Sequence, residues 1–380
     1  MLKNLKNLQK IDRKSSFIPN TEQIKNYDMI VFCHLRWEFV YQRPQHLISR
    51  MSKTMKILLI EEPVEYHESE ENSANLITIH EKLHVLQPKV KNIESIAAIL
   101  PDYIKNNNIG IGWFYSASFS PLLSVLNFDT LVYDCMDELS LFKGAPVHLI
   151  YQEKYLMAHA DIVFTGGKSL YESKKQFHSN VYCFPSSVDQ DHFAQALNGI
   201  EIPKDISNIK SPIVGYFGVI DERMDLELLH ESAKKAPNVS FVMIGPLAKI
   251  DQSDLPKEEN IHYLGMKSYM ELPNYLKAFD IAMMPFAIND STKYISPTKT
   301  LEYMAAGKPI ISTKITDVVR DYNLCVSLVD TPEEFCDVIH FLSDKCDSLS
   351  MQLEYYDILN KTSWDSTANQ MQLIIKEFAK

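Results

Sequence analysis

The sequence predicts an α/β protein with two doubly wound domains that face a cleft. Short apolar stretches alternate with amphipathic stretches along most of the 380 residues, which is typical of parallel sheets covered by helices. A polar segment that contains Pro203 and Pro212 interrupts this alternation once, and the alternation then restarts. A chain of this length can form two cores. We therefore expect a first domain over residues 1–195 and a second over 196–362.

In the first half, each predicted strand is a short apolar run that ends in polar residues. Helices are expected to begin at Arg43, Ser118 and Lys168. Ligands of open α/β sheets bind at the carboxyl ends of the strands, so the polar residues after these runs are candidates for a site. The predicted strands are Met29–Cys33, Lys56–Ile60, His84–Leu86, Ile109–Tyr115, Thr130–Tyr133 and Asp161–Thr165.

The second half repeats the pattern. Leu226–Lys235 and Tyr269–Ala278 have helical periodicity, and Trp364 begins a last helical stretch that continues to Phe378. The predicted strands are Pro212–Phe217, Val239–Ile244, Ile261–Leu264 and Ile281–Pro285.

Composition excludes several classes of function. The net charge of −11 argues against a general nucleic-acid binder, whose surface would be basic. None of the six cysteines is spaced as CxxC, so neither a zinc site nor a redox motif is supported. We find no secretory signal peptide and no apolar run near the roughly 18 residues of a spanning helix. The expected setting is a reducing cytoplasm.

Residues 1–14 differ from the rest of the chain. Leucine and isoleucine recur every third residue, and five cations accompany a single acid, Asp12. Such a basic amphipathic segment can lie on an anionic membrane surface. The alternative is a solvated terminal helix, so peripheral attachment to the inner face of a membrane stays open.

Residues 295–312 read as a loop, a short helix and a buried strand. Ser296 is a favourable N-cap, and Pro297 suits the first helical position. A helix that starts there would direct backbone N–H groups at an anion, and Lys299 adds a positive charge. Glu302, one turn along, could accept hydrogen bonds from sugar hydroxyls. This spacing matches a nucleotide diphosphate; an ordinary capped helix is the alternative.

Six segments occur in a fixed order along the chain: residues 39–47 (FVYQRPQHL), 133–138 (YDCMDE), 185–193 (PSSVDQDHF), 215–229 (GYFGVIDERMDLELL), 239–286 and 296–313 (SPTKTLEYMAAGKPIIST). Together they resemble the GT-B glycosyltransferases, and most of all glycosyltransferase family 4. That resemblance implies two Rossmann-like domains and a C-terminal helix, residues 363–380, that crosses back to the first domain. The first two segments resemble a bacterial subgroup that builds cell-surface polysaccharides.

The resemblance implies a nucleotide-sugar donor, most readily a UDP-sugar, held mainly by the second domain. By position, Glu302 would bind the ribose hydroxyls. The turn formed by Ser296, Pro297, Thr298 and Lys299 would meet the pyrophosphate. No other cofactor is expected.

Four more residues complete the implied donor site. Gly218 would let the backbone approach the phosphates, and Arg223 would add charge there. Gly265 and Met266 would lie near the base. Stabilising the negative charge on a departing diphosphate can be done by Lys299 and Arg223 without a metal.

The sequence departs from the family pattern at two places. The family has two glutamates eight residues apart, and Tyr294 occupies the earlier position, so the identity of the transferred sugar is open. Val219 stands where the family has an arginine, and Arg223 matches the family lysine only with a one-residue shift. A surface arginine beside two acids is the alternative for Arg223. Asp189 and Asp191 form a D-x-D inside residues 185–193, which resemble the family's junction between the two domains and which we call the junction segment. We interpret this D-x-D as coincidence, so no metal site is expected.

First-domain candidates follow from position after strands. Asp137 is the expected general base or acceptor-positioning group; helix capping is the alternative. Arg36 and Trp37 follow the first strand, and Arg43 and His46 open the next helix. An aromatic flanked by charges suits a sugar or an anionic acceptor, and a packed tryptophan with a solvated arginine is the alternative.

The sequence as a whole favours a hexosyltransferase-type enzyme, in which Asp137, Arg223 and Lys299 would act on the reacting groups. It would transfer sugar to a glycan or lipid-linked acceptor, with retention of anomeric configuration implied by the family. A nucleotide-sugar epimerase on the same fold is one alternative. A non-catalytic bilobed sugar-binding protein is another.

Overall fold

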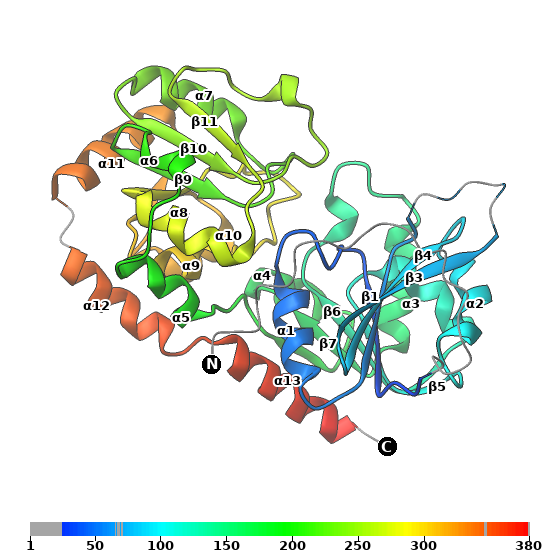
Figure 1. Cartoon of the computed structure of the whole chain (residues 1–380). Coiled ribbons are helices and arrows are strands. Elements are labelled where there is room, and N and C mark those ends of the chain that lie inside the picture. The colour runs from blue at the N-terminus through cyan, green and yellow to red at the C-terminus, as the bar shows by residue number, and fades with distance from the viewer. Residues whose placement is uncertain (1–24, 65, 67–68, 70, 346–347, 379–380) are drawn as a thin grey trace.

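The computed structural model describes residues 25–64, 66, 69, 71–345 and 348–378. Two separate sheets each form the centre of a lobe, and the lobes lie side by side (Figure 1). We call the part built on the earlier sheet the first lobe and the part built on the later sheet the second lobe. The basic segment predicted to contact a membrane, residues 1–14, lies outside the described residues.

The first lobe is built on an eight-stranded sheet of order β3-β4-β2-β1-β5-β6-β7-β8. Every neighbouring pair is parallel except β3 and β4. The central strands are apolar nearly throughout because helices cover both faces. The strands are β1 (Met29–Cys33), β2 (Ile57–Glu61), β3 (Ser73–His80), β4 (Leu83–Lys89), β5 (Asn108–Phe114), β6 (Asn127–Cys135), β7 (Ile162–Thr165) and β8 (Val181–Cys183).

The hairpin of β3 and β4 is the main difference from the predicted first lobe. Strand β3 was not predicted, because it lies at the edge of the sheet and its residues are mostly polar or exposed. The helix expected from Ser118 is a 3₁₀ helix, η3 (Ala117–Ser124), which contains Pro121. The helices of this lobe are α1 (Arg43–Met51), α2 (Ile96–Ile99), η2 (Leu100–Asp102), η4 (Leu139–Leu141), α3 (Leu149–His159) and α4 (Lys168–Lys174).

The second lobe is built on six parallel strands of order β11-β10-β9-β12-β13-β14. Counted from β9, this is the doubly wound order 3-2-1-4-5-6, whose direction reverses between β9 and β12. A crevice forms outside the carboxyl ends of the strands at that switch point. The strands are β9 (Ile213–Phe217), β10 (Ser240–Ile244), β11 (Ile261–Gly265), β12 (Ile281–Met284), β13 (Ile310–Thr313) and β14 (Ser327–Val329).

The helix predicted to begin at Ser296 begins later. Its first residue is Lys299, and Thr298 is the N-cap, so Ser296 and Pro297 belong to the preceding loop. The helices of the second lobe are α5 (Gln190–Phe193), η5 (Ala194–Leu197), α6 (Lys204–Ser207), α7 (Leu226–Lys235), η6 (Gln252–Asp254), η7 (Tyr269–Glu271), α8 (Leu272–Ala278), α9 (Lys299–Ala305), α10 (Thr316–Tyr322), α11 (Pro332–Lys345) and α12 (Ser348–Leu359).

The last helix, α13 (Trp364–Phe378), leaves the second lobe and packs on α1 of the first lobe, as the red end of the ribbon shows (Figure 1). Trp364, Met371 and Ile375 are buried in the first-lobe core. The helix before it, α12, packs on α9 of the second lobe. The chain therefore passes between the lobes twice.

Polar contacts also join the lobes behind the cleft. The Asp317 carboxylate of α10 accepts hydrogen bonds from the Ser169 backbone N–H at 3.1 and 3.3 Å, so a second-lobe acid caps the first-lobe helix α4. Arg320 pairs with Glu172 at 3.0 Å. Within the described residues, no helix combines the length and the hydropathy needed to cross a lipid bilayer.

Candidate functional site

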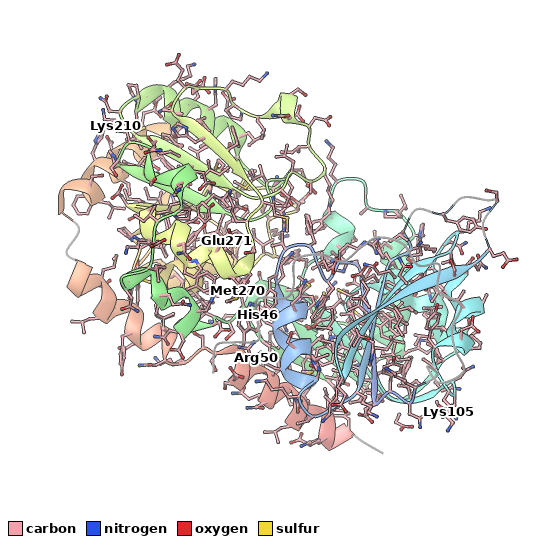
Figure 2. All side chains as sticks on the ribbon, viewed as in Figure 1. His46, Arg50, Lys105, Lys210, Met270 and Glu271 are labelled. Atoms are coloured by element: carbon pink, nitrogen blue, oxygen red, sulfur yellow. The ribbon has the colours of Figure 1, made fainter. Side chains whose placement is uncertain are left out.

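A cavity of about 130 Å³ lies between the lobes, at the switch point of the second sheet. Residues from both lobes line it. In Figure 2, His46 on α1 of the first lobe lies close to Met270 of the second. Ten of the predicted site residues line this cavity: Arg43, His46, Asp137, Gly218, Arg223, Ser296, Pro297, Thr298, Lys299 and Glu302.

Glycines end the three adjacent strands on one side of the switch point. Gly218, Gly245 and Gly265 follow or end β9, β10 and β11, and each has a positive φ, of 140°, 152° and 68°. A Cβ on Gly245 would lie 1.7 Å from the Gly218 carbonyl oxygen, and a Cβ on Gly218 would lie 2.3 Å from Lys299 Cε. Both positions require glycine. The absence of a side chain at Gly218 lets Lys299 lie directly against the backbone.

Lys299 is the cation at the centre of this arrangement. Its ammonium lies 5.4 Å from the Tyr216 ring centre and 6.0 Å from that of Phe286. In the described part of the chain, no hydrogen-bond acceptor or carboxylate within ion-pair distance engages this ammonium. Burial lowers its pKa, and Glu302 partly opposes that shift. Since α9 is only seven residues long, the positive charge here comes chiefly from the side chains.

Glu302 lies one turn along α9 from Lys299. It is 6% exposed, and the described residues supply no hydrogen-bond donor to its carboxylate. Burial raises its pKa to about 7, while Lys299 acts in the opposite direction. An ionised carboxylate without donors is unfavourable in such a place, so a ligand with hydroxyl groups would stabilise it.

Arg223 is oriented by an acid beside it. Its Nε donates to both Asp221 oxygens at 3.0 Å, and its Nη2 donates at 2.6 Å, in a bidentate pair. The guanidinium also lies 5.4 Å from the Phe142 ring centre, across the cleft in the first lobe. The Asp221 carboxylate therefore holds Arg223 at the cavity rather than at an open surface.

Asp137 follows β6 and faces the second lobe. Burial raises the pKa of its carboxyl, and Arg223 acts against that shift. Among the described residues, no donor is hydrogen-bonded to this carboxylate. Asp137 also lines a second cavity, of about 430 Å³, that adjoins the central one and shares Gln42, Met136, Val219 and Arg223 with it.

The loop before α9 is fixed by the interlobe junction. Ser186 Oγ donates to the Ser296 carbonyl at 2.8 Å, and Thr298 Oγ1 donates to Ser186 Oγ at 3.0 Å. These bonds explain why Ser296 does not cap the helix, because its backbone is held by the junction segment. The Pro297 carbonyl instead accepts from the Thr300 N–H at 3.2 Å.

Arg43 and His46 line the cavity but are occupied by structural contacts. Arg43 donates to Asp134 three times, at 2.9 to 3.2 Å, and to the Phe184 carbonyl at 2.8 Å. Arg43 therefore has a structural role in this structure, and its predicted role as an acceptor ligand stays a prediction. His46 stacks on Trp364 with ring centres 4.7 Å apart, and burial holds its pKa well below the ordinary value.

Arg36 and Trp37 do not line the central cavity, and their predicted contact with the acceptor stays a prediction. Arg36 pairs with Glu61 at 3.2 Å, and the backbone N–H of Trp37 donates to the same carboxylate at 2.7 Å. Glu61 ends β2, so it draws the loop after β1 toward its own strand. Trp37 lines a separate groove together with Met266.

Three predicted donor residues also lie outside the central cavity. Gly265 ends β11, and the exposed side chain of Met266 lines the groove that contains Trp37. Tyr294 lines a groove on another face with Ser169 and Arg320, and its ring packs on the first-lobe core. The sequence spacing placed Tyr294 correctly before α9 but could not give the direction of its loop.

Sequence reasoning missed the aromatic side of the cavity. Tyr41, Tyr216, Tyr269 and Phe286 all line it. Tyr216 and Phe286 stand next to strand ends, which was a usable signal. Tyr41 and Tyr269 meet only because the lobes meet. The second cavity adds His34, Glu62, Ser118, Phe142 and Lys249.

Comparisons with known proteins agree with this arrangement. Residues 211–345, most of the second lobe, match the family model described as Glycosyl transferases group 1. Sucrose-phosphate synthase from Thermosynechococcus elongatus superposes with a TM-score of 0.67 at 12% identity, over 92% of this chain and 98% of the other. The chain has the GT-B fold. The recognition of a GT-B glycosyltransferase from the motifs is confirmed.

Two further proteins are similar to this chain. Anabaena HepE in complex with UDP and glucose superposes with a TM-score of 0.67 at 13% identity, over 92% of this chain and all of that one. The putative teichuronic acid biosynthesis glycosyltransferase TuaH of Bacillus subtilis (strain 168) is 23% identical over 220 residues. That match covers 53% of this chain and 55% of TuaH, so it spans about half of each protein.

No group of three or more His, Cys, Asp or Glu side chains is placed to hold a metal ion within the described residues. Asp189 is engaged with Arg50 of α1 at 3.3 Å, across the junction between the lobes. The D-x-D that contains it therefore belongs to the lobe interface of this GT-B chain.

Proposed function

We propose that this chain is a glycosyltransferase that moves a sugar from a nucleotide-diphosphate sugar to a glycan or lipid-linked acceptor. One observation carries the proposal. At the switch point of the second sheet, the cation Lys299 and the carboxylate of Glu302, neither of which is paired by any described residue, line one cavity beside the bare backbone of Gly218. The cation suits a diphosphate, and the carboxylate suits the hydroxyls of a ribose.

In the reaction, the bond between the sugar C1 and the diphosphate oxygen breaks, and a bond from C1 to an acceptor hydroxyl oxygen forms. Negative charge then develops on the departing diphosphate. Lys299 and Arg223 are held at the cavity before the reaction, so they can stabilise this charge without rearranging.

The acceptor would enter through the adjoining cavity of about 430 Å³. Asp137 lines both cavities, so it stands where the acceptor hydroxyl would meet the donor. We propose that Asp137 positions this hydroxyl and can accept its proton. Phe142 and Lys249, whose ammonium lies 4.6 Å from the Phe142 ring centre, bring the two lobes together over this cavity.

The central cavity is smaller than the roughly 300–1,000 Å³ of ordinary ligand pockets. We therefore propose that the lobes separate to admit the donor and close again for the reaction. Such closure would exclude water from the reacting sugar.

The relatives support the finer features of the proposal. HepE and a trehalose-6-phosphate synthase of Escherichia coli are described with UDP or a UDP-sugar bound, which supports a UDP-sugar as donor. TuaH is described as a teichuronic acid biosynthesis enzyme, which supports a role in cell-surface polysaccharide synthesis. Membership of family 4, retention of configuration, independence of metals and a cytoplasmic location at the inner face of the membrane are proposed from the motifs.

The comparisons do not favour the epimerase or the non-catalytic sugar-binding protein. An epimerase needs polar groups around the sugar ring, and Tyr294, which stands at the position of the missing family glutamate, points to another face. A sugar-binding protein needs no site for a diphosphate.

Calorimetric titration with UDP, GDP and dTDP tests the proposal. Transfer assays with sugars linked to the nucleotide that binds would follow. We expect one nucleotide to bind, and we expect Lys299→Ala and Glu302→Ala each to weaken that binding. Lys234→Ala, which changes an exposed lysine on α7, is the matched control. If both site variants bind as tightly as the wild type, the assigned site is wrong.

A further inference from the structure

The hydroxyl of Tyr269 is buried and, within the described part of the chain, has no hydrogen-bond partner. Its residue lines the central cavity with Glu302 and Leu272. A buried hydroxyl without a partner is unfavourable, so it marks a place where a ligand atom belongs. Nothing in the sequence motifs pointed to this residue.

The ring of Tyr269 is fixed on both faces. Tyr41 of the first lobe stacks on one face with ring centres 4.6 Å apart and planes at 28°. His192 of α5 stacks with centres 4.3 Å apart and planes at 14°. The rings of His46 and Phe193 make T-shaped contacts with Tyr269, with ring centres 5.4 and 5.6 Å from its own. A nucleotide base therefore has no free face of Tyr269 on which to stack, and the hydroxyl alone is available to a ligand.

Tyr269 belongs to the second lobe and lies at the boundary with the first lobe, as the residues next to it in the chain show. Figure 2 labels Met270 and Glu271, which follow it in η7, close to His46 and Arg50 on α1. Tyr41 precedes α1, and its own hydroxyl is directed at the Gln45 carbonyl and Ser49 Oγ, each 3.5 Å away. The first lobe thus supplies the surface against which Tyr269 rests.

Glu302 lines the same cavity as Tyr269 and is near enough to act on it electrostatically. The phenol keeps its proton, because burial first and the Glu302 carboxylate second raise its pKa. A protonated phenol donates, and a carboxylate accepts. Two neighbouring hydroxyls of a ligand, each both donor and acceptor, would satisfy the two groups together. In a nucleotide, the ribose carries such a pair.

We propose that the Tyr269 hydroxyl completes the ribose subsite to which Glu302 belongs, so that the phenol donates to one ribose hydroxyl while the carboxylate accepts from a ribose hydroxyl. This inference rests on the proposed function, because it requires a nucleotide in the cavity. It adds that Tyr41 positions Tyr269, so nucleotide affinity depends on a first-lobe residue through the stacked rings.

The test is calorimetric titration of the whole chain with UDP, 2′-deoxy-UDP and 3′-deoxy-UDP. We expect Tyr269→Phe, which keeps the stacked ring, to bind UDP about tenfold more weakly. We also expect its preference for UDP over at least one of the deoxy analogues to shrink by a similar factor. Tyr263→Phe is the matched control, because that hydroxyl donates to the Pro256 carbonyl at 3.1 Å away from the cavity.

The positioning role of Tyr41 is tested by a conservative pair. Tyr41→Phe keeps the ring and should bind UDP like the wild type, whereas Tyr41→Ala should bind several-fold more weakly. Unchanged UDP affinity in Tyr269→Phe, or equal weakening for UDP and both analogues, overturns the ribose subsite. Equal affinities in the two Tyr41 variants overturn the positioning role. If the wild type binds no nucleotide, the proposed function itself fails, which is a different result.

Discussion

Two cations near helix starts line the same cavity from opposite lobes, yet they differ in how many hydrogen bonds they make within the protein. Arg43 opens α1 in the first lobe, and each nitrogen of its guanidinium donates to Asp134 or to the Phe184 carbonyl. Lys299 opens α9 in the second lobe, and the described residues leave its ammonium without an acceptor. The first lobe therefore uses its charge to hold its own strands, whereas the second presents its charge to a ligand.

The same contrast applies to the acids. Asp134 is saturated by Arg43, whereas Glu302 and Asp137 face the cavity. A residue type and its place at a strand end are thus insufficient to assign a role. A cation that is paired within the protein has a structural role, whereas a cation that is left unpaired can bind a ligand. Five variants test this distinction.

Arg43→Met is expected to have the largest effect. It would leave Asp134 buried without its partner and lower the free energy of unfolding by about 3–5 kcal/mol. Urea denaturation measures this loss. Replacing both partners, Arg43→Met with Asp134→Leu, should recover part of the stability. A stable Arg43→Met protein whose acceptor KM alone rises would restore the acceptor role predicted from the sequence.

Lys299→Met should lower activity and leave stability unchanged, which is the opposite of the result expected for Arg43→Met. We expect kcat/KM to fall by about 100- to 1,000-fold, because charge on the departing diphosphate loses a prepared partner. Stability should not fall, since burial lowers the pKa of Lys299 and so opposes its charge in the folded state. Donor kinetics and urea denaturation together check this. A loss of stability as large as that of Arg43→Met would mean that Lys299 is structural.

Gly218→Ala tests the close approach of Lys299 to the backbone. The new methyl group would displace Lys299, at a position where φ is already unfavourable for alanine, so we expect about a 10- to 100-fold loss of kcat/KM. Gly307→Ala is the control, because Gly307 has a φ of 62° at the end of α9 but does not line the cavity. The control should lose stability only. Equal losses of activity in both variants would argue against displacement of Lys299.

Glu302→Gln tests the charge of the ribose-binding acid. Its pKa of about 7 lies above that of the unfolded chain, so ionisation between about pH 4.5 and 7 lowers wild-type stability as the pH rises. Without ligand, Glu302→Gln should therefore be more stable than the wild type at pH 8, by about 1–3 kcal/mol. UDP-glucose affinity should rise several-fold from pH 6 to 8 in the wild type and stay low and flat in the variant. Parallel pH profiles would exclude Glu302 as the titrating group.

Asp317→Ala should have the smallest effect. It removes the acid that caps α4 from the other lobe, which costs about 1 kcal/mol. Small-angle scattering should show a slightly larger radius of gyration, because the lobes separate more easily. Asp321→Ala, which removes a more exposed interlobe ion pair with Lys168, is the comparison and should change less. No change in either variant would mean that these contacts do not hold the lobes together.

The fold was predictable because buried parallel strands are short, apolar and regularly spaced. The runs at residues 29–33 and 281–284 became β1 and β12 almost unchanged. Strand β3 was missed, because an edge strand exposes polar side chains and lacks that signal. The helix start at residue 296 was misplaced by the junction segment, since Ser186 holds the loop from a distant part of the chain.

The candidate site was predictable where it follows strand ends of one sheet. Gly218, Lys299 and Glu302 share such an edge, and the family resemblance of their motifs assigned them to one site. Contacts between segments that are distant in the chain carry no such signal. The saturation of Arg43 by Asp134 and the stacking of Tyr41 on Tyr269 depend on residues 91 and more than 200 positions apart in the chain.

The return of α13 to the first lobe has a mechanical consequence. The polypeptide bridges the lobes once after β8 and again before Trp364. Two tethers at separate points restrict one rigid body to rotation about the line that joins them. Opening should therefore be a hinge rotation about this line, and the edge of the cleft near Phe142 and Lys249 should move farthest. A chain cut before Trp364 would keep one tether and gain twisting and sliding that the intact molecule does not allow.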